Sequence, residues 1–333
     1  MVEHKFSTLG MQEALKRLYD GTPFAPFKPA AHRVLLEGID FNLMYFPLKH
    51  LGYKAVVGVT GELFARMMHP VALSLVLGVS AKLDYPQIQE LWSGVVAAAK
   101  EYGYEDVSLS LQPSQTGLCI SVSAEGKLKD LTRHSLPKPA SKDVLCVSGR
   151  LGAAYLGLQV LERERVRFEA GTTKASEDME KYKMLVSAYL HPELSSGIVK
   201  ALEDDEIYPS GAVFITHGLA DAVKRLSRAT GLGAKVYADR IPFEGNSFEL
   251  GKMLDIDPVS AAMNGGEDYQ LLLSIPILQA EKFRREFQTW DIIGHLAQSD
   301  VGTVLVAPTG VELPLRAQGW TEAEDEAETN SEA

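Results

Sequence analysis

Hydrophobic residues recur along this chain with two distinct spacings. From 87 to 102 they return every three or four positions, after Asp84 and Pro86 and before Gly103. This spacing predicts an amphipathic helix with a capped start and a defined end. A shorter amphipathic pattern predicts a helix at 11–19. Apolar runs of strand length predict strands at 34–41, 55–60, 73–79, 107–111 and 118–124.

In the second half of the chain the two patterns alternate. Apolar runs predict strands at 144–147, 213–216, 269–275 and 303–306. Helical spacing covers 151–161, much of 175–202, and 219–230 before Gly231. Such alternation is typical of an α/β or α+β domain. The stretch 136–143 (LPKPASKD) resembles a linker, so we expect domains at 1–140 and 141–318 and a tail at 319–333.

Length and charge narrow the class of protein. A chain of 333 residues has room for two domains, and 46% apolar with 23% charged residues is an ordinary globular composition. The net charge of −11 argues against a broad nucleic-acid-binding surface, which needs basic residues to neutralise phosphates. After Trp320 the chain is acidic without any basic residue. We interpret this segment as a solvated tail; if it binds a basic partner instead, deletion of 321–333 should abolish that binding.

Cysteines and targeting signals favour the cytoplasm. Cys119 and Cys146 are far apart and belong to no cluster with zinc-ligand spacing, which excludes a disulfide framework. The first ten residues are polar and lack the apolar segment of a signal peptide. The most apolar stretch, 70–81, is much shorter than the ~20 residues of a membrane helix. We therefore expect a cytoplasmic protein that has no membrane segment.

The common nucleotide and hydrolase motifs are absent from this sequence. The strongest local signal is the run Asn264–Leu271 (NGGEDYQL). Gly265 and Gly266 permit a close turn, and the carboxylates of Glu267 and Asp268 follow at the start of a strand, where they could hold a substrate or a metal. Spacing alone favours a simpler role, in which the aspartate accepts backbone N–H bonds in a tight turn.

Two further corners join a predicted strand to a helix. At 147–154 the chain passes through Gly149 and Gly152, which can present backbone N–H groups to an anion or simply let the helix pack closely on the sheet. At the second corner, His217 precedes Gly218 and stands where ligand-binding side chains often lie. A corner histidine more often caps a helix or packs against it. The residue pattern leaves both alternatives open at each corner.

Taken in order, these segments resemble the thiamine-monophosphate kinase family, a relative of aminoimidazole ribonucleotide synthetase. GGEDY is distinctive, and the similar stretches span nearly the whole chain in a fixed order. They are 35–41 (LLEGIDF), 51–55 (LGYKA), 147–158 (VSGRLGAAYLGL), 218–219 (GL), 230–242 (TGLGAKVYADRIP), 264–272 (NGGEDYQLL), 292–294 (IIG) and 319–320 (GW).

The resemblance implies a fold and a chemistry. The fold is a two-domain α/β (α+β) synthetase-like fold, in which an N-terminal αβ domain forms a barrel with a second copy and a C-terminal α/β domain packs beside it. The family binds ATP and Mg²⁺ near the dimer interface and phosphorylates thiamine monophosphate to the diphosphate in thiamine biosynthesis. Phosphoryl transfer depends on charge neutralisation and alignment, which carboxylate-bound Mg²⁺ supplies.

The resemblance also assigns candidate residues, although it assigns no catalytic one. The substrate-binding candidates are Asp40, Gly265, Gly266, Glu267, Asp268 and Trp320. The nucleotide-binding candidates are Gly149, Gly152, His217 and Gly218, and the metal candidate is Glu62. Trp320 matches a family position that stacks on the thiamine ring, and a role as a packing anchor is equally well supported.

Most of the family's metal-binding aspartates are replaced in this sequence. Arg33 stands where the resemblance implies an aspartate, and His217 stands for the aspartate of a Ser-Asp-Gly corner. Gln112 lies in the counterpart of a Gly-Gly-Asp-Thr motif. The counterpart of the Asn-x-Ser-Asp motif keeps a carboxylate only at Glu62, and the proline-rich connector 20–31 lacks an early Gly-Asp-Asp motif. Losing one such group commonly costs ~10²–10³ in rate, and several are missing together.

We therefore expect a thiamine-monophosphate-kinase-like pseudoenzyme with a degenerate Mg–ATP site, weakly active or inactive, in a binding or regulatory role. The alternative is an active kinase with a rebuilt metal site. In that case five carboxylates should converge on one cleft, namely Glu37, Asp40, Glu62, Glu267 and Asp268. The expected partners are a second copy of the chain and thiamine monophosphate or a related phosphorylated ligand, with neither nucleic acid nor a membrane.

Overall fold

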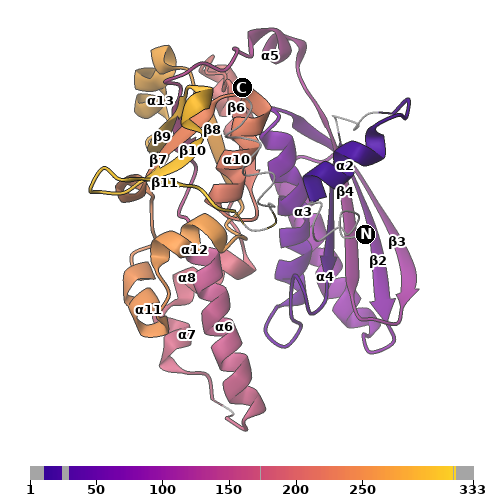
Figure 1. Ribbon diagram of the computed structural model, residues 1–333. Helices are drawn as coiled ribbons and strands as arrows, with labels where there is room; N and C mark the ends of the chain where they lie inside the picture. The colour runs from indigo at the N-terminus through magenta and orange to yellow at the C-terminus, as the bar shows by residue number, and fades with distance from the viewer. Residues whose placement is uncertain (1–10, 25–29, 173, 318, 320–333) are drawn as a thin grey trace.

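The computed structural model describes residues 11–24, 30–172, 174–317 and 319 (Figure 1), and the strands of this part form two sheets. The first sheet has the order β1-β4-β2-β3. Its strands are β1 (Ala30–Leu36), β2 (His69–Ser80), β3 (Asp106–Ser114) and β4 (Cys119–Lys127). β4 runs antiparallel to β1 and β2, whereas β2 and β3 are parallel. The parallel pair is possible because a helix crosses over between these two strands.

The crossover is α4 (Tyr85–Glu101), which lies beside α3 (Leu48–Phe64) on one side of the first sheet. α4 begins where the sequence predicts it. The Gln87 N–H donates to the Asp84 carboxylate at 3.0 Å, and the Asp84 N–H donates to the Gln87 side chain at 2.9 Å. This reciprocal pair satisfies N–H groups that a helix start otherwise leaves without an acceptor. The predicted helix at 11–19 is also confirmed as α2 (Met11–Tyr19).

The strand predicted at 55–60 is wrong, because these residues belong to α3. The apolar run with Val56, Val57 and Val59 has the composition of a strand. In the structure almost every residue of α3 is buried, since the helix lies between the first sheet and the rest of the molecule (Figure 1). A helix that is buried on all sides carries no amphipathic stripe, so the spacing that usually reveals a helix is missing here.

The second sheet has the order β11-β10-β7-β9-β5-β8-β6. Its strands are β5 (Val144–Val147), β6 (Gly211–Ile215), β7 (Gly233–Tyr237), β8 (Gln270–Ile275), β9 (Asp291–Ala297), β10 (Thr303–Val306) and β11 (Glu312–Pro314). Neighbours are antiparallel except for β7 and β10. The predicted strands at 144–147 and 303–306 are confirmed with the same bounds.

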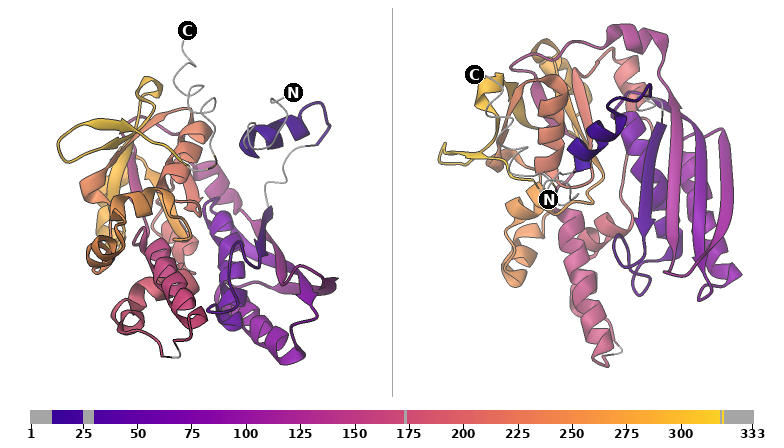
Figure 2. Two further views of the ribbon diagram at one scale, coloured as in Figure 1. Left: turned by 60° about the horizontal axis from the view of Figure 1, so that its bottom comes forward. Right: turned by 45° about the vertical axis from the view of Figure 1, so that its right-hand side comes forward.

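Helices occupy most of the remaining described chain. They are α5 (Asp130–Ser135), α6 (Ala153–Glu169), α7 (Glu177–Lys181), α8 (Lys183–Leu190), α9 (Ile198–Asp204), α10 (Leu219–Thr230), α11 (Ser247–Leu254), α12 (Pro258–Asn264), α13 (Ala280–Glu286) and the short turns η1 (Ala238–Arg240), η2 (Ile277–Gln279) and η3 (Ser299–Val301). α6 packs along α8, and its far end projects away from both sheets (Figure 2). α10 ends at Gly231 with φ +69°, the left-handed cap that the sequence predicts.

Hydrophobic cores lie on both faces of the second sheet. One face contributes Val213 and Ile215 to a core beneath α10. The other face contributes Phe214, Leu271 and Leu273 to a larger core that also contains α3 and the inner face of the first sheet. The two sheets therefore share one core with α3 between them, and the ends of β6 and β8 meet α3 at this junction.

The predicted domain boundary near residue 140 falls in the segment between the two sheets, next to α5. The division into 1–140 and 141–318 stays a prediction, because the shared core joins both parts. Within the described ranges, no helix is both long and apolar enough to span a bilayer.

Candidate functional site

The GGEDY turn and the His217 corner lie side by side at the junction. The Glu267 N–H donates to the Thr216 carbonyl at 2.8 Å, and the Tyr269 N–H donates to the Ile215 carbonyl at 3.0 Å. Glu267 and Tyr269 have φ values of +64° and +54°. Such backbone conformations are costly for residues with a Cβ and persist only where surrounding contacts enforce them. The turn is therefore held firmly against the end of β6.

Asp268 connects this turn to the third sequence signal, the start of α6. Its carboxylate accepts the Gly152 N–H at 2.9 Å and the Ala154 N–H at 3.3 Å. Burial raises the pKa of Asp268 to about 7, although these two hydrogen bonds favour the charged form. In the structure the aspartate thus accepts backbone N–H bonds, the simpler role considered for it. These two N–H groups of the glycine-rich corner already have an acceptor.

The candidate glycines sit where neighbouring groups come close. Gly149 lies against the Gln270 side chain, and Gly265 lies against the Tyr155 ring. Gly218, with φ +98°, approaches the backbone of α12. A side chain at any of these positions would overlap its neighbour, so each glycine serves close packing at the junction.

Glu267 is held between two cations that come from the first part of the chain. Its Oε1 lies 2.9 Å from Arg33 Nη2, and its Oε2 lies 2.9 Å from Lys54 Nζ. Burial alone would raise the pKa of Glu267, but the charges of Lys54 and Arg33 outweigh it and lower the pKa. Because Arg33 is on β1 and Lys54 on α3, this pairing ties the turn to both elements.

Lys54 is almost completely buried, with aromatic rings around its ammonium group. Nζ lies 3.9 Å from the centroid of the Tyr189 ring, 5.2 Å from that of Tyr269 and 5.4 Å from that of Phe46. It also donates a hydrogen bond to the Tyr189 carbonyl at 2.8 Å. A desolvated cation–π contact contributes up to about 2 kcal/mol. The rings and Glu267 together stabilise a buried charge that would otherwise be costly.

A cavity of about 1030 Å³ lies at the same junction. Its walls come from α2, β1, α3, α10 and the corner before α10. Three of the predicted site residues line it, namely Asp40, Glu62 and His217. Three arginines also line it, namely Arg33, Arg66 and Arg225. Basic and acidic side chains therefore line one space that is large enough for a small molecule.

Glu62 is paired much more loosely than Glu267. Its Oε1 lies 3.3 Å from Arg225 Nη2, and its Oε2 lies 3.8 Å from Arg66 Nη2. Arg225 Nη1 is a further 3.8 Å from Asp221 Oδ2. Charge-assisted hydrogen bonds usually measure about 2.7–2.9 Å, so the hydrogen bond that Arg225 donates to Glu62 is a long one, and the contact between Glu62 and Arg66 is a loose ion pair.

The two remaining candidate carboxylates are bound to backbone near β1. Asp40 Oδ2 accepts the Leu36 N–H at 2.7 Å, and Glu37 Oε2 accepts the Leu118 N–H at 2.6 Å. Both contacts stabilise the turn that follows β1. This turn occupies part of the strand predicted at 34–41, which ends at Leu36 in the structure.

The described residues do not fit the magnesium ion that the family resemblance implies. Mg²⁺ needs oxygen ligands that converge with octahedral geometry. In the ranges that the structure describes, no group of three or more His, Cys, Asp or Glu side chains could hold a metal ion. Asp40 and Glu62 share the cavity, but Glu267 is taken by cations and Asp268 by α6. The convergence that a rebuilt metal site predicts is not found among these residues.

Known proteins share both the sequence pattern and the fold of this chain. No family model matches the chain. The thiamine-monophosphate kinase of Aquifex aeolicus (strain VF5) is 24% identical over 274 residues, which cover 80% of this chain and 83% of that protein. The structure of AaThiL complexed with AMPPCP and TMP has a TM-score of 0.71 and 19% identity, and covers 92% of this chain and 95% of that chain. The resemblance to thiamine-monophosphate kinases is confirmed.

A second kind of protein shares the fold of the thiamine-monophosphate kinases. E. coli HypE, a hydrogenase maturation protein, has a TM-score of 0.66 and 15% identity, and covers 86% of this chain and 85% of that chain. These matches confirm the expected α/β, synthetase-like fold class. Because proteins of different function share this fold, the activity of the present chain has to be argued from its own residues.

Two residues of this site, Lys54 and Arg225, are not among the candidates that the sequence predicts. The signal for Lys54 is a lysine inside the apolar run LGYKAVVGV, because a buried charge needs a counter-ion. Arg225 has a weaker signal, its i, i+4 spacing from Asp221 on a predicted helix. Trp320 and the acidic tail lie outside the described residues, so the thiamine-stacking role and the tail's role stay predictions.

Proposed function

We propose that this chain is a thiamine-monophosphate-kinase-like protein with a degenerate Mg–ATP site, weakly active or inactive, that serves a binding or regulatory role. The observation that carries the proposal is the pairing of Glu267 with Arg33 and Lys54. A carboxylate that is already neutralised by two cations of its own chain is a poor ligand for a metal ion. Arg33 also keeps a permanent charge where the resemblance implies a metal-binding aspartate.

The ligand that we propose is thiamine monophosphate or a related small phosphorylated molecule. AaThiL was solved in complex with AMPPCP and TMP, and the present chain shares its fold over most of its length. The cavity lined by Asp40, His217 and Arg33 is the space that supports such a ligand. We place this binding in the cytoplasm, with no nucleic acid among the partners.

A kinase assay tests the proposal. The purified chain is incubated with thiamine monophosphate, ATP and Mg²⁺, and thiamine diphosphate is measured beside the Aquifex aeolicus kinase under the same conditions. We expect product formation at least ~10³-fold below that of the Aquifex protein, since several charge neutralisers are missing. Turnover comparable to that of the Aquifex protein would overturn the proposal.

The rival function is an active kinase with a rebuilt metal site. It is favoured by one observation, that Asp40 and Glu62 line the same cavity. If these carboxylates hold Mg²⁺, Glu62→Gln should reduce Mg²⁺-dependent turnover by at least ~10²-fold. An equal, residual rate in the wild type and in Glu62→Gln would reject the rival.

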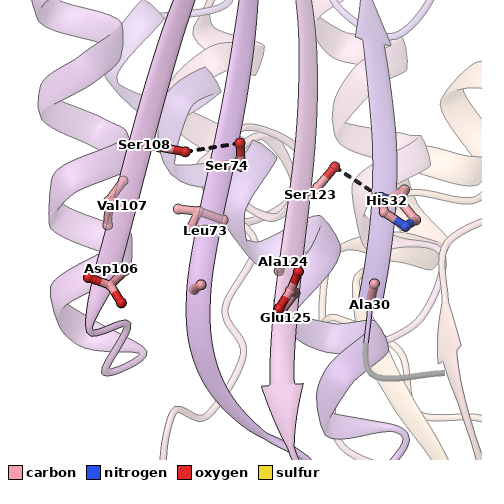
Figure 3. A pocket seen from close by; sticks show the side chains of 11 residues that line it. Ala30, His32, Leu73, Ser74, Asp106, Val107, Ser108, Ser123, Ala124 and Glu125 are labelled. Carbon is pink, nitrogen blue, oxygen red and sulfur yellow. Dashed lines mark hydrogen bonds between the residues drawn. The ribbon is translucent and has the colours of Figure 1, made fainter. Parts of the chain in front are cut away.

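We also propose that two copies of the chain associate through the open face of the first sheet. Figure 3 shows this face, where Ser108 donates to Ser74 Oγ at 3.0 Å and His32 is hydrogen-bonded to Ser123 Oγ at 2.9 Å. Small side chains there leave a shallow pocket of about 310 Å³. In the next row of the same face, Val34 and Val76 are 52% and 41% exposed. Exposed valines on a sheet face favour contact with another apolar surface.

Light scattering tests the dimer. The wild type should have the mass of two chains, and Val76→Glu should shift it to one chain, because a buried unpaired charge is costly at an interface. Leu278→Glu serves as the control, because Leu278 is 95% exposed and lies in η2, outside the first sheet. A monomeric wild type, or a dimer that tolerates Val76→Glu, would contradict this arrangement.

A further inference from the structure

The cavity at the junction contains an arginine that is only loosely paired. Arg225 Nη2 is 3.3 Å from Glu62 Oε1, while Nη1 is 3.8 Å from Asp221 Oδ2 and donates to the Phe214 carbonyl at 3.4 Å. Its side chain is 29% exposed, so the guanidinium group faces the space of the cavity. A guanidinium has five N–H donors in a planar fork that matches the oxygens of a phosphate group. Loose contacts leave much of this donor capacity for another anion.

Arg33 provides a second guanidinium in the wall of this space. Its hydrogen bond to Glu267 is made through Nη2, while Arg33 itself lines the cavity. Glu267 is shared with Lys54, so the three groups Arg33, Lys54 and Glu267 carry one excess positive charge. The same cavity is also lined by the carboxylates of Asp40, Glu62 and Asp221, so an anion is favoured there where it takes the place of one of them beside the arginines.

Glu62 is the group that an incoming anion would displace. Its carboxylate lies closer to Arg225 than that of Asp221 does, and its side chain is 23% exposed. Partly exposed ion pairs at such distances contribute about 0–1 kcal/mol, in the range where a better-fitting anion can compete. A phosphate group has three oxygens that can accept two parallel N–H bonds from one guanidinium, which a carboxylate at 3.3 Å does not achieve here.

We propose that this cavity binds the phosphate group of a small molecule without a metal ion, with Arg225 and Arg33 as its ligands and Glu62 as the resident anion that the phosphate displaces. The inference rests on the proposed function, because an intact Mg²⁺ site would instead use Glu62 as a metal ligand. The ligand class is a phosphate ester or a diphosphate, whose negative charge the guanidinium groups neutralise.

Calorimetry in the presence of EDTA tests this inference on the full-length chain. The probes are pyrophosphate and thiamine monophosphate, with thiamine as the control that lacks a phosphate group. We expect both phosphorylated probes to bind in EDTA, with affinities that Mg²⁺ does not increase, and thiamine to bind at least ~10-fold more weakly. No binding in EDTA, or binding that needs Mg²⁺, would overturn the inference.

Two variants sharpen the test because they are expected to act in opposite directions. Arg225→Gln should weaken pyrophosphate binding about 10-fold or more, as expected for a lost charge-assisted bond. Glu62→Gln should tighten it by about 3–5-fold, because the competing carboxylate becomes neutral. Arg285→Gln is the matched control, since Arg285 is paired with Glu286 on α13, away from the cavity. If Glu62→Gln weakens binding, or Arg225→Gln leaves it unchanged, the exchange of Glu62 for phosphate is wrong.

The two proposals fail in different ways. Mg²⁺-dependent formation of thiamine diphosphate, lost in Glu62→Gln, would defeat the proposed function and this inference together. Absence of turnover together with absence of pyrophosphate binding would defeat the inference alone. Metal-free binding without turnover supports both.

Discussion

Glu267 and Glu62 lie at the same junction and each faces two cations, yet their surroundings differ. Glu267 has contacts of 2.9 Å to Arg33 and Lys54, whose side chains are 15% and 2% exposed. Glu62 has contacts of 3.3 and 3.8 Å to Arg225 and Arg66, which are 29% and 39% exposed. Attraction between charges strengthens as water is excluded, so the first cluster is structural and the second can exchange partners.

This contrast shows how cationic side chains can serve two different purposes at one junction. In the first cluster, two cations bind a carboxylate of the GGEDY turn and thereby join β1 and α3 to the second sheet. In the second cluster, arginines surround a space that remains open to a ligand. Under the proposed function, the cationic groups of the two clusters would have two consequences at once, since they would disfavour a metal ion and leave a surface suited to anions.

The largest expected effect is on the tight cluster. Glu267→Gln removes the negative charge that Arg33 and Lys54 share and leaves a buried ammonium without this counter-ion. We expect the free energy of unfolding to fall by about 3–5 kcal/mol, measured by urea unfolding. The double variant Lys54→Met/Glu267→Gln should recover part of this loss, because it removes the buried charge as well. A loss below about 1 kcal/mol in Glu267→Gln would show that the two clusters are equivalent.

The next prediction concerns how the free energy of unfolding depends on pH through the carboxyl group of Asp268. The pKa of its folded-state carboxyl group is about 7, above its ordinary 3.8. Between these values the folded protein binds a proton that the unfolded chain has lost, so the contribution of Asp268 to stability falls as pH rises from about 4 to about 7. Asp268→Asn cannot titrate and keeps one oxygen, which can accept one of the two N–H bonds that the carboxylate accepts from Gly152 and Ala154 at the start of α6.

Urea unfolding at pH about 5 and about 8 measures this difference. The wild type should lose more stability over the interval than Asp268→Asn, by up to about 1.4 kcal/mol per pH unit. Asp268→Ala provides the comparison, because it removes the titrating group and the hydrogen-bond acceptor together and should be less stable at both values. Identical pH dependence in the wild type and the Asn variant would show that the carboxyl group is ionised throughout.

Disturbing the contact between α3 and β6 should lower the free energy of unfolding by less than Glu267→Gln does. A methyl group at Gly61 would overlap the Phe214 ring, which packs edge-on against Tyr269 at a centroid distance of 5.5 Å. Gly61→Ala should cost about 1–3 kcal/mol in unfolding free energy, because overpacking shifts both rings. Gly197→Ala is the control, since no neighbouring atom lies within 4 Å of the position that its methyl group would take. Equal free energies of unfolding for the two variants would show that the Phe214 and Tyr269 rings can move to accommodate the methyl group.

How much of this junction can be predicted from the sequence depends on the range of its interactions. The capping box at Asp84, the Gly231 cap and the strand at 144–147 depend on neighbouring residues, so local patterns are sufficient. α3 is missed because burial on every side removes its periodicity. The pair Arg33–Glu267 joins positions 234 apart in sequence, and only the topology brings them together. Resemblance to a family identifies the positions but cannot reveal which cations pair tightly.

The smallest expected effect on stability is also the one that separates the two clusters most clearly. Glu62→Gln removes a carboxylate that lies 3.3 Å from Arg225, so the free energy of unfolding should change by less than about 1 kcal/mol. Urea unfolding beside Glu267→Gln measures both changes under one set of conditions. A near-neutral Glu62→Gln that binds pyrophosphate more tightly is the behaviour of an exchangeable anion. If Glu62→Gln instead lowered the free energy of unfolding by several kcal/mol, Glu62 would be a structural ion-pair partner like Glu267. The arginines around it would then not be available to a ligand.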